Sequence, residues 1–425
     1  MINSASIDAL KRAQWTPHFN RPLYDSYSFS LIPQTISQLL TGTSDLTLPV
    51  DTVGGKWELF DCVVLFLIDG FGWEFFEGFA HQYPFLNRFS NEGVASKISS
   101  QFPSTTAAHV TTINTDLEVG LSGIYEWFYH EPKVGEMIAP LLFSYAGDHV
   151  VSTLVKKGYT AHQLFPFETF YQQLKKKGVK SIVMQQESIA HSPYSRAMLA
   201  GAENIPYVHF TDAMDQLKTI CETPKREPTY IFVYFGEIDA MGHRHGITSP
   251  KFADAVEFCW NTIENRFWQP LSPKKKTAVL VTADHGMVPV DPKKTIYLNQ
   301  LFPEIKEMIQ PSVTGKALIP AGSCRDFFLH CKEERLEEVQ CVLQEKLSGI
   351  ADVVKVDELL KNHFFGREKP SKRLKDRVGN LVILPYLGES VWWFEKHRFE
   401  QHFFAAHGGL TPPEIESIFL YQTRS

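Results

Sequence analysis

The sequence lacks three features that would point to large classes of protein. No apolar stretch approaches the roughly 20 residues that span a bilayer, so no membrane segment is predicted. Six cysteines are present and none form a C-x-x-C pair, which favours buried, reduced thiols. The net charge of −6 argues against a protein whose main partner is a nucleic-acid polymer.

The N-terminal residues contain no basic stretch followed by an apolar one, so no secretory leader is predicted. Together with reduced cysteines, this favours a cytoplasmic location, although export without a leader would leave the same features. The length of 425 residues, with 44% hydrophobic and 21% charged residues, suits a globular enzyme larger than one minimal domain.

Three short apolar runs each precede an aspartate. They cover residues 63–68, 230–235 and 278–282, and they lead to Asp69, Asp239 and Asp284. Unbroken runs of this length are typical of strands buried on both faces of a parallel sheet. Apolar residues at three- and four-residue spacing over 252–267 predict an amphipathic helix between two of them. The pattern predicts an α/β fold with a mainly parallel central sheet flanked by helices, and ligands beyond the carboxyl ends of its strands.

The order of these segments also predicts a division of the chain. Residues 1–55 are expected to form an N-terminal extension packed on the core, and residues 56–293 and 399–425 the catalytic core. Residues 294–398 change in character and predict a small inserted α+β cap, with strands near 326–331, 351–356 and 381–384 and a helix over 333–347. The segment 365–377 is expected to be a basic loop.

Two sequence motifs could hold a divalent metal. Asp239 and His243 stand four residues apart just after a strand, and together they supply an oxygen and a nitrogen ligand. In Asp284-His285-Gly286, both side chains reach one metal only if the strand breaks there, which Gly286 permits. Taken alone, Asp239 and His243 are more commonly explained as a strand-end turn and a surface histidine, whereas Asp284-His285-Gly286 fits a turn and a metal site equally well.

The remaining motifs are also weak by themselves. Asp69-Gly70 and His407-Gly408-Gly409 have the composition of turns. The hydroxyls of Thr105 and Thr106 precede helix-compatible residues, so either could cap a helix. The alternative is a helix N-terminus that aims N–H groups at a phosphate, with a hydroxyl placed to attack it.

The order of the five motifs resembles the alkaline phosphatase superfamily, and most closely its type I phosphodiesterase and nucleotide pyrophosphatase family. The resemblance implies an alkaline phosphatase-like fold and two divalent metals, usually zinc, with manganese or iron as alternatives that suit the same ligands. It assigns one metal to Asp239, His243 and His407, and the other to Asp69, Asp284, His285 and the oxygen of Thr106. Thr106 is the expected nucleophile because it stands three residues after Pro103; Thr105 is the alternative.

The chemistry of these groups agrees with that assignment. A threonine hydroxyl is a poor nucleophile at neutral pH, and coordination to a metal favours its alkoxide. Two metals about 4 Å apart hold the attacking and leaving oxygens of an in-line displacement. The expected reaction therefore passes through phospho-Thr106, which water activated on the second metal releases, and no organic cofactor is needed.

The sequence departs from the family at the substrate. Relatives commonly carry an asparagine after a Gly-Ile pair, and here Glu126 or Trp127 occupies that position. Trp127 could stack on a base or fill the core, and His109 stands where relatives often have asparagine. The candidate substrate contacts are therefore His109, Trp127 and Phe71. The expected partner is a small phosphorylated substrate, with a nucleotide as one candidate.

Three alternatives remain beside a phosphodiesterase or nucleotide pyrophosphatase. A phosphomonoesterase and a phosphonate hydrolase of the same superfamily would use the same metals. A metal-stabilised binding or effector protein would keep the site without turnover. Sulfatases and cofactor-independent phosphoglycerate mutases are disfavoured because their branches do not use threonine as the nucleophile.

Overall fold

A seven-stranded sheet forms the centre of the molecule. The computed structural model describes residues 1–424 except residues 225 and 274–275. The strands follow the order β2-β18-β9-β1-β8-β6-β7, and β18 is antiparallel to both of its neighbours while the other pairs are parallel. The expected mainly parallel sheet is confirmed. Its strands are β1 (Cys62–Ile68), β2 (Val94–Ser99), β6 (Lys180–Gln186), β7 (Glu203–Tyr207), β8 (Thr229–Phe235), β9 (Thr277–Thr282) and β18 (Glu416–Arg424).

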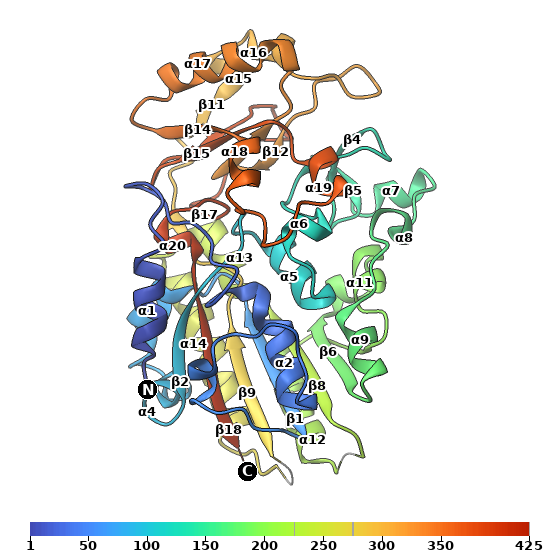
Figure 1. The fold of residues 1–425 in the computed structure, drawn as a ribbon, viewed down its shortest axis with the longest axis vertical. Helices are drawn as coiled ribbons and strands as arrows, with labels where there is room; N and C mark the ends of the chain where they lie inside the picture. Colours follow the sequence, from blue (N-terminus) through green and yellow to red (C-terminus); the bar gives the residue numbers. More distant parts are fainter. Residues whose placement is uncertain (225, 274–275, 425) are drawn as a thin grey trace.

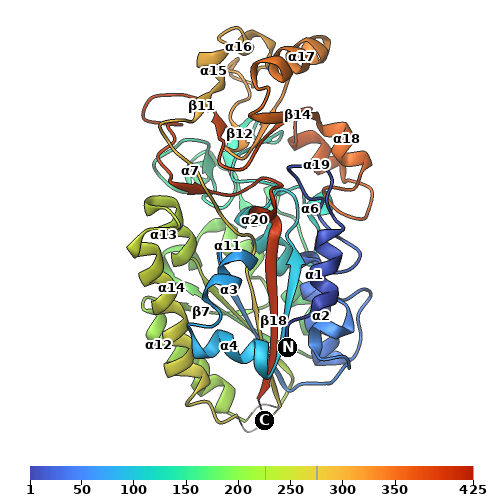
Figure 2. The ribbon, with the colours of Figure 1, turned by 90° about the vertical axis from the view of Figure 1, so that its left-hand side faces the viewer.

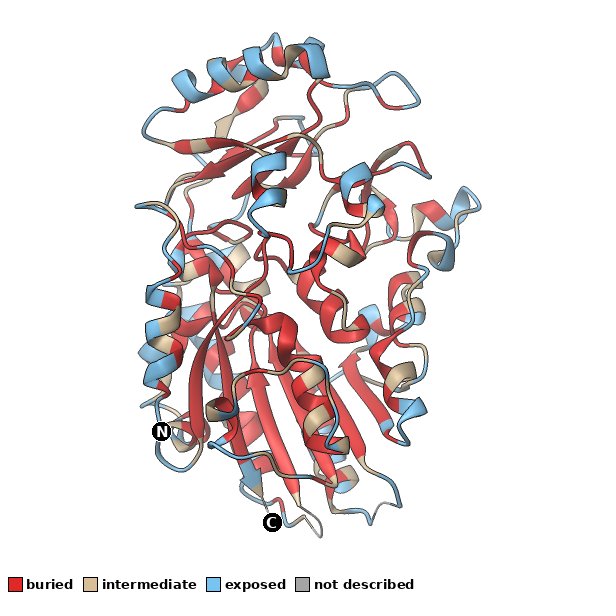
Figure 3. Cartoon of the chain, viewed as in Figure 1, coloured by how far each residue is buried: buried red, intermediate tan, exposed pale blue. Residues whose placement is uncertain are grey.

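Helices cover both faces of the sheet (Figure 2). Successive residues of β1 point to opposite faces, so Leu65 belongs to one apolar cluster and Phe66 to the other. All seven residues of this strand are buried, as the continuous apolar run predicts (Figure 3). Helices on the first face include α2 (Ile32–Thr41), α5 (Thr106–Thr115), α9 (Phe170–Lys176) and α11 (Pro193–Met198). Those on the second include α3 (Trp73–Phe79), α4 (Pro84–Asn91), α12 (Phe210–Glu222) and α14 (Pro250–Thr262).

The helix expected over 252–267 is present, but its end departs from α geometry. α14 continues as a π-helical segment, Ile263–Trp268, in which Ile263 and Phe267 remain buried. The three- and four-residue spacing of the apolar residues therefore locates the helix correctly but does not reveal this change.

The N-terminal segment packs on the edge of the sheet. The N–H of Asn3 donates to the carbonyl of Ala95 at 2.8 Å, and the N–H of Ala95 donates to Met1 at 2.9 Å. The segment contains α1 (Ser4–Lys11), α2 and two short 3₁₀ turns, Phe29–Leu31 and Val50–Val53. It covers unpaired groups of β2, an edge strand that would otherwise expose them.

A second, smaller sheet stands above the carboxyl ends of the central strands (Figure 1). Its four strands are antiparallel in the order β12-β13-β15-β14, and helices lie beside it. These elements are β12 (Ala321–Ser323), β13 (Asp326–Leu329), β14 (Ala351–Lys355), β15 (Leu381–Pro385), α15 (Leu298–Leu301), α16 (Ile305–Met308), a 3₁₀ turn (Glu333–Arg335), α17 (Leu336–Lys346) and α18 (Val356–Lys361). The exact limits of this cap stay a prediction.

Part of the segment expected to be a basic loop is helical. Residues Lys372–Arg377 form α19, which begins because the Ser371 hydroxyl accepts a hydrogen bond from the N–H of Leu374. Leu374 and Arg377 are buried. The loop prediction was wrong there because the charge pattern hid the capping residue and the two buried positions.

A three-stranded sheet from an earlier part of the chain joins the cap. It consists of β3 (Tyr129–Glu131), β4 (Glu136–Ala139) and β5 (Ser144–Tyr145). The N–H of Val313 donates to Gly135 at 3.1 Å, and Arg377 forms a buried ion pair with Glu131. The smaller lobe is therefore assembled from two separate parts of the sequence.

The remaining short elements connect these layers. They are α6 (Val119–Ser122), α7 (Thr153–Lys156), α8 (Ala161–Leu164), α10 (Glu187–Ala190), α13 (Glu237–His245), α20 (Pro412–Ile415), β10 (Val288–Pro289), β11 (Ile296–Tyr297), β16 (Val391–Trp392) and β17 (Ala405–Ala406). Within the described residues, no helix combines the length and the apolar character needed to cross a bilayer.

Candidate metal centre

Three aspartates meet at the carboxyl ends of neighbouring strands. Asp69 directly follows β1, Asp284 lies two residues beyond β9, and Asp239 lies in the first turn of α13 after β8. Asp69 and Asp284 are buried, and Asp239 is largely buried. Among the described residues, their ion-pair partners within 4 Å are histidines and include no lysine or arginine. Three buried carboxylates without a lysine or arginine partner need a positive counter-charge from another source.

Three imidazoles face these carboxylates through the same nitrogen. The Nδ1 atoms of His243, His285 and His407 lie 2.7, 3.1 and 3.0 Å from backbone carbonyl oxygens. A carbonyl only accepts, so each Nδ1 carries the proton and each Nε2 keeps a lone pair for the centre. The Nε2 atoms of His243 and His407 lie 3.3 and 3.6 Å from Asp239 Oδ1.

The six predicted ligands lie in one cluster with two possible metal positions. Asp239, His243 and His407 form one group, as expected, with ligand atoms within 4.8 Å of one another. The second such group contains Asp69, His285 and again Asp239. Asp284 adjoins it, because its Oδ2 lies 3.3 Å from His285 Nε2 while its Oδ1 accepts from the N–H of Gly70 at 3.1 Å. Asp239 therefore stands between the two groups, which the sequence did not show.

Two buried oxygens of this cluster have no hydrogen-bond partner within the described residues: Asp239 Oδ1 and Asp284 Oδ2. Buried polar atoms are almost always paired, and an unpaired buried carboxylate oxygen is suited to coordinate a cation. The donor set is all oxygen and imidazole nitrogen, which suits zinc, manganese or iron. The residues present therefore fit divalent metals.

Burial shifts the titration of these groups, and a cation at the cluster would reverse the shift of the carboxyls. Burial raises the pKa of Asp69 well above its usual value, and the neighbouring Asp284 and Asp239 raise it further. Burial also raises the pKa of Asp239 to about 6. The pKa values of His285 and His407 are well below the usual range, again mainly because of burial. Neutral imidazoles are competent ligands, and a cation would favour the ionised form of the buried Asp69 carboxyl.

Of the two candidate threonines, Thr106 lies at the cluster. Its Oγ1 is 3.3 and 3.4 Å from the Asp69 oxygens and 3.2 Å from His285 Nε2. Thr105 is buried, and its hydroxyl contacts the carboxyl of Glu126 instead. Thr106 is also the first residue of α5, where free backbone N–H groups favour an anion.

Tyr234 belongs to the centre although the sequence did not single it out. Its hydroxyl donates to Asp69 Oδ2 at 2.5 Å from the end of β8. Burial, followed by the charge of Asp69, raises the pKa of this tyrosine well above its usual value, so it remains a donor. Its only signal in the sequence is a polar hydroxyl near the end of an apolar run.

Two glycines give the centre its shape for different reasons. Gly70 has φ of 73°, the left-handed region, which turns the chain immediately after Asp69. Gly286 lacks such a φ; a Cβ there would lie 2.1 Å from the carbonyl oxygen of Pro413. The need for glycine after His285 therefore comes from close packing and not from the broken strand that the sequence suggested.

The loop that carries His407 is held by a buried ion pair between distant residues. Arg325 donates two hydrogen bonds to Glu414, at 2.9 and 2.8 Å, and neither side chain is exposed. Glu414 also accepts from the N–H of Gly409 at 3.1 Å. Arg325 comes from the turn between β12 and β13. The cap thus supports the loop of a candidate metal ligand of the core, and no motif indicated this pair.

The sequence that carries these residues matches the profile of one protein family. The profile described as "Type I phosphodiesterase / nucleotide pyrophosphatase" matches residues 63–410, which contain all six ligands and Thr106. The chain belongs to the type I phosphodiesterase/nucleotide pyrophosphatase family. The resemblance inferred from the five motifs is confirmed.

Individual relatives are distant. Ectonucleotide pyrophosphatase/phosphodiesterase family member 3 of Rattus norvegicus is 22% identical over 290 residues, 66% of this chain. The chain matches only 31% of that protein's length. Murine ectonucleotide pyrophosphatase/phosphodiesterase 5 shares the fold with a TM-score of 0.60 at 17% identity, over 85% of this chain and 87% of that one. Phosphonoacetate hydrolase from Sinorhizobium meliloti, in complex with phosphonoformate, has a TM-score of 0.59 at 16% identity, over 87% and 92%.

Two of the three residues that were expected to contact the substrate face away from the candidate metal centre. Phe71 is fully buried on the opposite face of the sheet, 4.9 Å from the ring of Trp260. His109 is also fully buried, and both ring nitrogens bind backbone groups, of Gln101 at 2.8 Å and of Thr105 at 2.7 Å. Both assignments are corrected: Phe71 packs the core, and His109 supports the turn before Thr106.

Trp127, the third expected contact, lies near the cluster, and its contact with a substrate stays a prediction. It is 37% exposed and lines a cavity of about 240 Å³ that also reaches Asp69, Thr106 and Asp239. Glu126, the other residue at the family's asparagine position, is buried, and burial raises its pKa to about 7. Glu126 is not among the residues that line this cavity, which we call the chamber.

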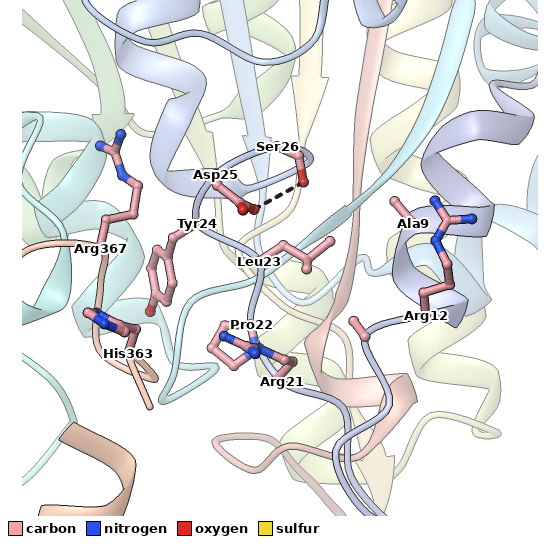
Figure 4. Close-up of a pocket in the computed structure, with 11 residues that line it drawn as sticks. Ala9, Arg12, Arg21, Pro22, Leu23, Tyr24, Asp25, Ser26, His363 and Arg367 are labelled. Atoms are coloured by element: carbon pink, nitrogen blue, oxygen red, sulfur yellow. Dashed lines mark hydrogen bonds between the residues drawn. The ribbon is translucent and has the colours of Figure 1, made fainter. Parts of the chain in front are cut away.

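A second hollow lies apart from the metal centre. It measures about 560 Å³ between the N-terminal segment and the loop that carries His363 and Arg367. Figure 4 shows the guanidinium groups of Arg12, Arg21 and Arg367 standing apart from one another. None of the predicted site residues lines this hollow, which we call the arginine hollow.

Proposed function

We propose that the chain is a metal-dependent phosphodiesterase or nucleotide pyrophosphatase that uses Thr106 as its nucleophile. The observation that carries this proposal is the position of Thr106 Oγ1, 3.2–3.4 Å from atoms of two proposed metal ligands, Asp69 and His285. Around it lie buried carboxylates that have no lysine or arginine partner within the described residues.

Asp239, His243 and His407 are proposed to hold one divalent metal, and Asp69, Asp284 and His285 the other, with zinc first and manganese or iron as alternatives. Bound there, the metals supply Lewis acidity that neutralises phosphoryl charge and lowers the pKa of a coordinated hydroxyl. Family membership and the two unpaired carboxylate oxygens support this assignment.

The residues of the chain have separate tasks in the proposed reaction. Thr106 Oγ1 attacks phosphorus, the bond to the leaving oxygen breaks, and a phospho-Thr106 intermediate forms. Water then attacks the same phosphorus and releases Thr106. Tyr234 holds Asp69 in place through its 2.5 Å hydrogen bond. The backbone N–H groups that begin α5 face the phosphoryl oxygens.

A nucleotide is one candidate substrate. An inactive threonine-to-alanine variant of murine ectonucleotide pyrophosphatase/phosphodiesterase 5 has been crystallised with AMP. A phosphonate hydrolase or phosphomonoesterase is the second candidate, because the fold is equally close to that of phosphonoacetate hydrolase.

The test compares adjacent hydroxyls on a panel of substrates. Thr106→Ala should lower turnover of bis-p-nitrophenyl phosphate by about 10,000-fold, as loss of a nucleophile does. Thr105→Val removes the neighbouring hydroxyl and should keep turnover within about tenfold. p-Nitrophenyl phosphate and phosphonoacetate, each assayed with zinc and with manganese, should be poorer substrates.

Each other result would assign the chain differently. Turnover unchanged in Thr106→Ala would exclude the covalent mechanism. A preference for p-nitrophenyl phosphate or phosphonoacetate would support the second candidate. Two bound metals without turnover of any compound would indicate a binding protein, and fewer than two metals per chain would contradict the ligand assignment.

A further inference from the structure

The candidate metal centre is more open on one side than on the other. The side chains of Asp239 and His243 keep 16 and 18% of their surface exposed, and that of His407 keeps 11%. On the other side, the His285 side chain is fully buried and Asp69 keeps 3%. A group that leaves during the reaction must reach solvent. The open side therefore offers it the shortest way out, past Asp239, His243 and His407.

The position of the proposed nucleophile indicates the same direction. Thr106 Oγ1 lies on the buried side, 3.3 Å from Asp69 Oδ1 and 3.2 Å from His285 Nε2. In an in-line displacement, the attacking and leaving oxygens lie on opposite sides of phosphorus. The leaving oxygen would therefore lie toward His243 and His407. When its bond to phosphorus breaks, the electron pair stays on this oxygen, and the group that it carries meets the side chains beside His243.

The loop before β17 wraps around His243 and places an aromatic ring there. The carbonyl of Ala405 accepts from His243 Nδ1 at 2.7 Å, and the N–H of Phe404 donates to the carbonyl of His243 at 2.8 Å. The ring of Phe403 lies against the imidazole, with 4.6 Å between the ring centroids. The N–H of Phe403 donates to Gln401 Oε1 at 3.2 Å, which fixes the backbone of this residue. Phe403 is thus held beside a candidate metal ligand.

Much of the Phe403 side chain stays uncovered. It is 46% exposed although its ring contacts His243. Phe404 is exposed to a similar extent, 50%, but its side chain starts beside Gly246 at the end of α13, where a Cβ added to the glycine would lie 3.4 Å from Phe404 Cβ. A planar apolar group that covers an exposed ring removes apolar surface from water and gains the ring–ring interaction as well. Phe403 offers such a surface on the open side of the centre.

We propose that Phe403 contacts the leaving group of the substrate and favours planar, apolar leaving groups over phosphate. The proposal rests on the proposed function and adds the class of leaving group. The face of an aromatic ring carries partial negative charge, so it does not favour the anionic oxygens of a phosphate leaving group. Phe403 is a specificity residue in this scheme and takes no part in bond breaking.

Two methyl esters with different leaving groups test the proposal. Methyl p-nitrophenyl phosphate loses p-nitrophenolate, and methyl diphosphate loses inorganic phosphate. Both leave the same methylphospho-Thr106, which water then hydrolyses. The value of kcat/KM for each substrate covers the steps up to departure of the leaving group, so hydrolysis of the shared intermediate does not enter the comparison. The ratio of the two values, aryl over diphosphate, measures the preference for the leaving group.

Phe403→Ala removes the ring and should lower this ratio by about tenfold, with kcat/KM for methyl diphosphate unchanged. Phe403→Leu keeps apolar bulk without a ring and should give an intermediate ratio. Phe404→Ala is the matched control, because it removes the neighbouring ring of similar exposure and keeps the backbone N–H that binds His243. Its ratio should equal that of the wild type.

Two binding measurements distinguish a contact with the leaving group from support of His243. Calorimetry on metal-loaded Thr106→Ala protein measures binding of methyl p-nitrophenyl phosphate without turnover, and adding Phe403→Ala should weaken it about fivefold. The zinc dissociation constant of Phe403→Ala should equal that of the wild type. Weaker zinc binding, together with an equal fall in kcat/KM for both substrates, would show that Phe403 only positions His243 and would overturn the proposal.

The remaining outcomes separate this proposal from the proposed function. An aryl-to-diphosphate ratio that Phe403→Ala leaves unchanged, an equal fall in Phe404→Ala, or turnover of methyl diphosphate alone would overturn the assignment of Phe403. In each of these cases turnover itself would still support the proposed function. Absence of turnover of both substrates by the metal-loaded wild type would reject the proposed function, and the assignment of Phe403 with it.

Discussion

The chamber and the arginine hollow differ most in how their polar atoms are satisfied. The arginine hollow is more than twice as large, about 560 against 240 Å³. Its arginines are nevertheless solvated or paired. Arg12 and Arg21 are exposed to solvent, and Arg367 donates a hydrogen bond to Glu118 at 2.7 Å. The chamber and the adjoining candidate metal centre instead contain buried atoms that lack a hydrogen-bond partner among the described residues, on Gln185, Asp239 and Asp284.

This difference separates the two hollows by how their polar atoms are solvated. Exposed charges are solvated and leave nothing for a ligand to complete. A buried, unpaired donor or acceptor raises the free energy of the empty site, and a ligand or metal that pairs it recovers that cost. The volume of a hollow alone would have pointed to the wrong one.

The largest expected effect contrasts a buried arginine with the exposed arginines of the hollow. Arg325→Met removes one partner of a fully buried ion pair and leaves the Glu414 carboxylate without its cationic partner. The free energy of unfolding should fall by about 3–5 kcal/mol, measured by urea denaturation of the metal-loaded protein. A loss no larger than that of Arg21→Met would show that the pair does not hold the His407 loop.

The next prediction concerns how the free energy of unfolding depends on pH when the carboxylates have no metal. Without metal, folding raises the pKa of Asp239 from 3.8 to about 6. The folded state then holds its proton more tightly, so this group lowers stability as pH rises from about 4 to 6. The shift of about two units corresponds to about 3 kcal/mol. Chelated wild type should therefore lose stability relative to chelated Asp239→Asn over this range.

The depressed pKa values of His285 and His407 act in the opposite direction, which is why the comparison uses the difference between two proteins that both contain them. Unfolding by urea at several pH values after chelation measures this difference. Parallel curves for the two proteins would mean that Asp239 is not strained in the metal-free state. Added zinc should remove the pH dependence of the difference, because the carboxylate is then ionised throughout.

A smaller effect separates two hydroxyls of one strand. Tyr234→Phe removes the hydrogen bond to Asp69 and should lower kcat/KM by roughly tenfold. This fold-change corresponds to the loss of about 1.5 kcal/mol from that hydrogen bond. Tyr230→Phe is the matched control, because the buried Tyr230 hydroxyl has no partner among the described residues. Its kcat/KM should be unchanged. Equal effects of the two substitutions would deny Tyr234 a specific role.

The smallest effect is expected in the arginine hollow. Arg21→Ala removes an exposed side chain and should change the free energy of unfolding by less than about 0.5 kcal/mol. Turnover of bis-p-nitrophenyl phosphate should also be unchanged. A tenfold fall in kcat/KM would show that the arginine hollow belongs to the substrate site. The two hollows would then not differ in function.

The parts of the site that were predictable follow local rules. Asp69 and Asp284 were found because a buried parallel strand is a continuous apolar run and its end is a favoured place for ligands. Asp239 and His243 were found from a four-residue spacing that α13 places on one face. The order of the motifs then supplied the family, and with it His407 and Thr106.

The parts that failed depend on which way a side chain faces. Phe71 lies two residues from Asp69, and the left-handed turn at Gly70 sends it to the opposite face of the sheet. His109 lies three residues after Thr106, but its ring turns toward the backbone of Gln101 and Thr105. Proximity in sequence to a ligand did not determine either direction.

The sequence by itself therefore determined the α/β class, the six proposed ligands and the family, because these depend on strand ends, short spacings and motif order. Only the tertiary structure decided that Asp239 stands between the two metal positions and that Tyr234 binds Asp69. It also decided that Arg325 holds Glu414 from 89 residues away and that Gln185 faces the chamber. These depend on contacts between distant segments, for which a single sequence carries no local pattern.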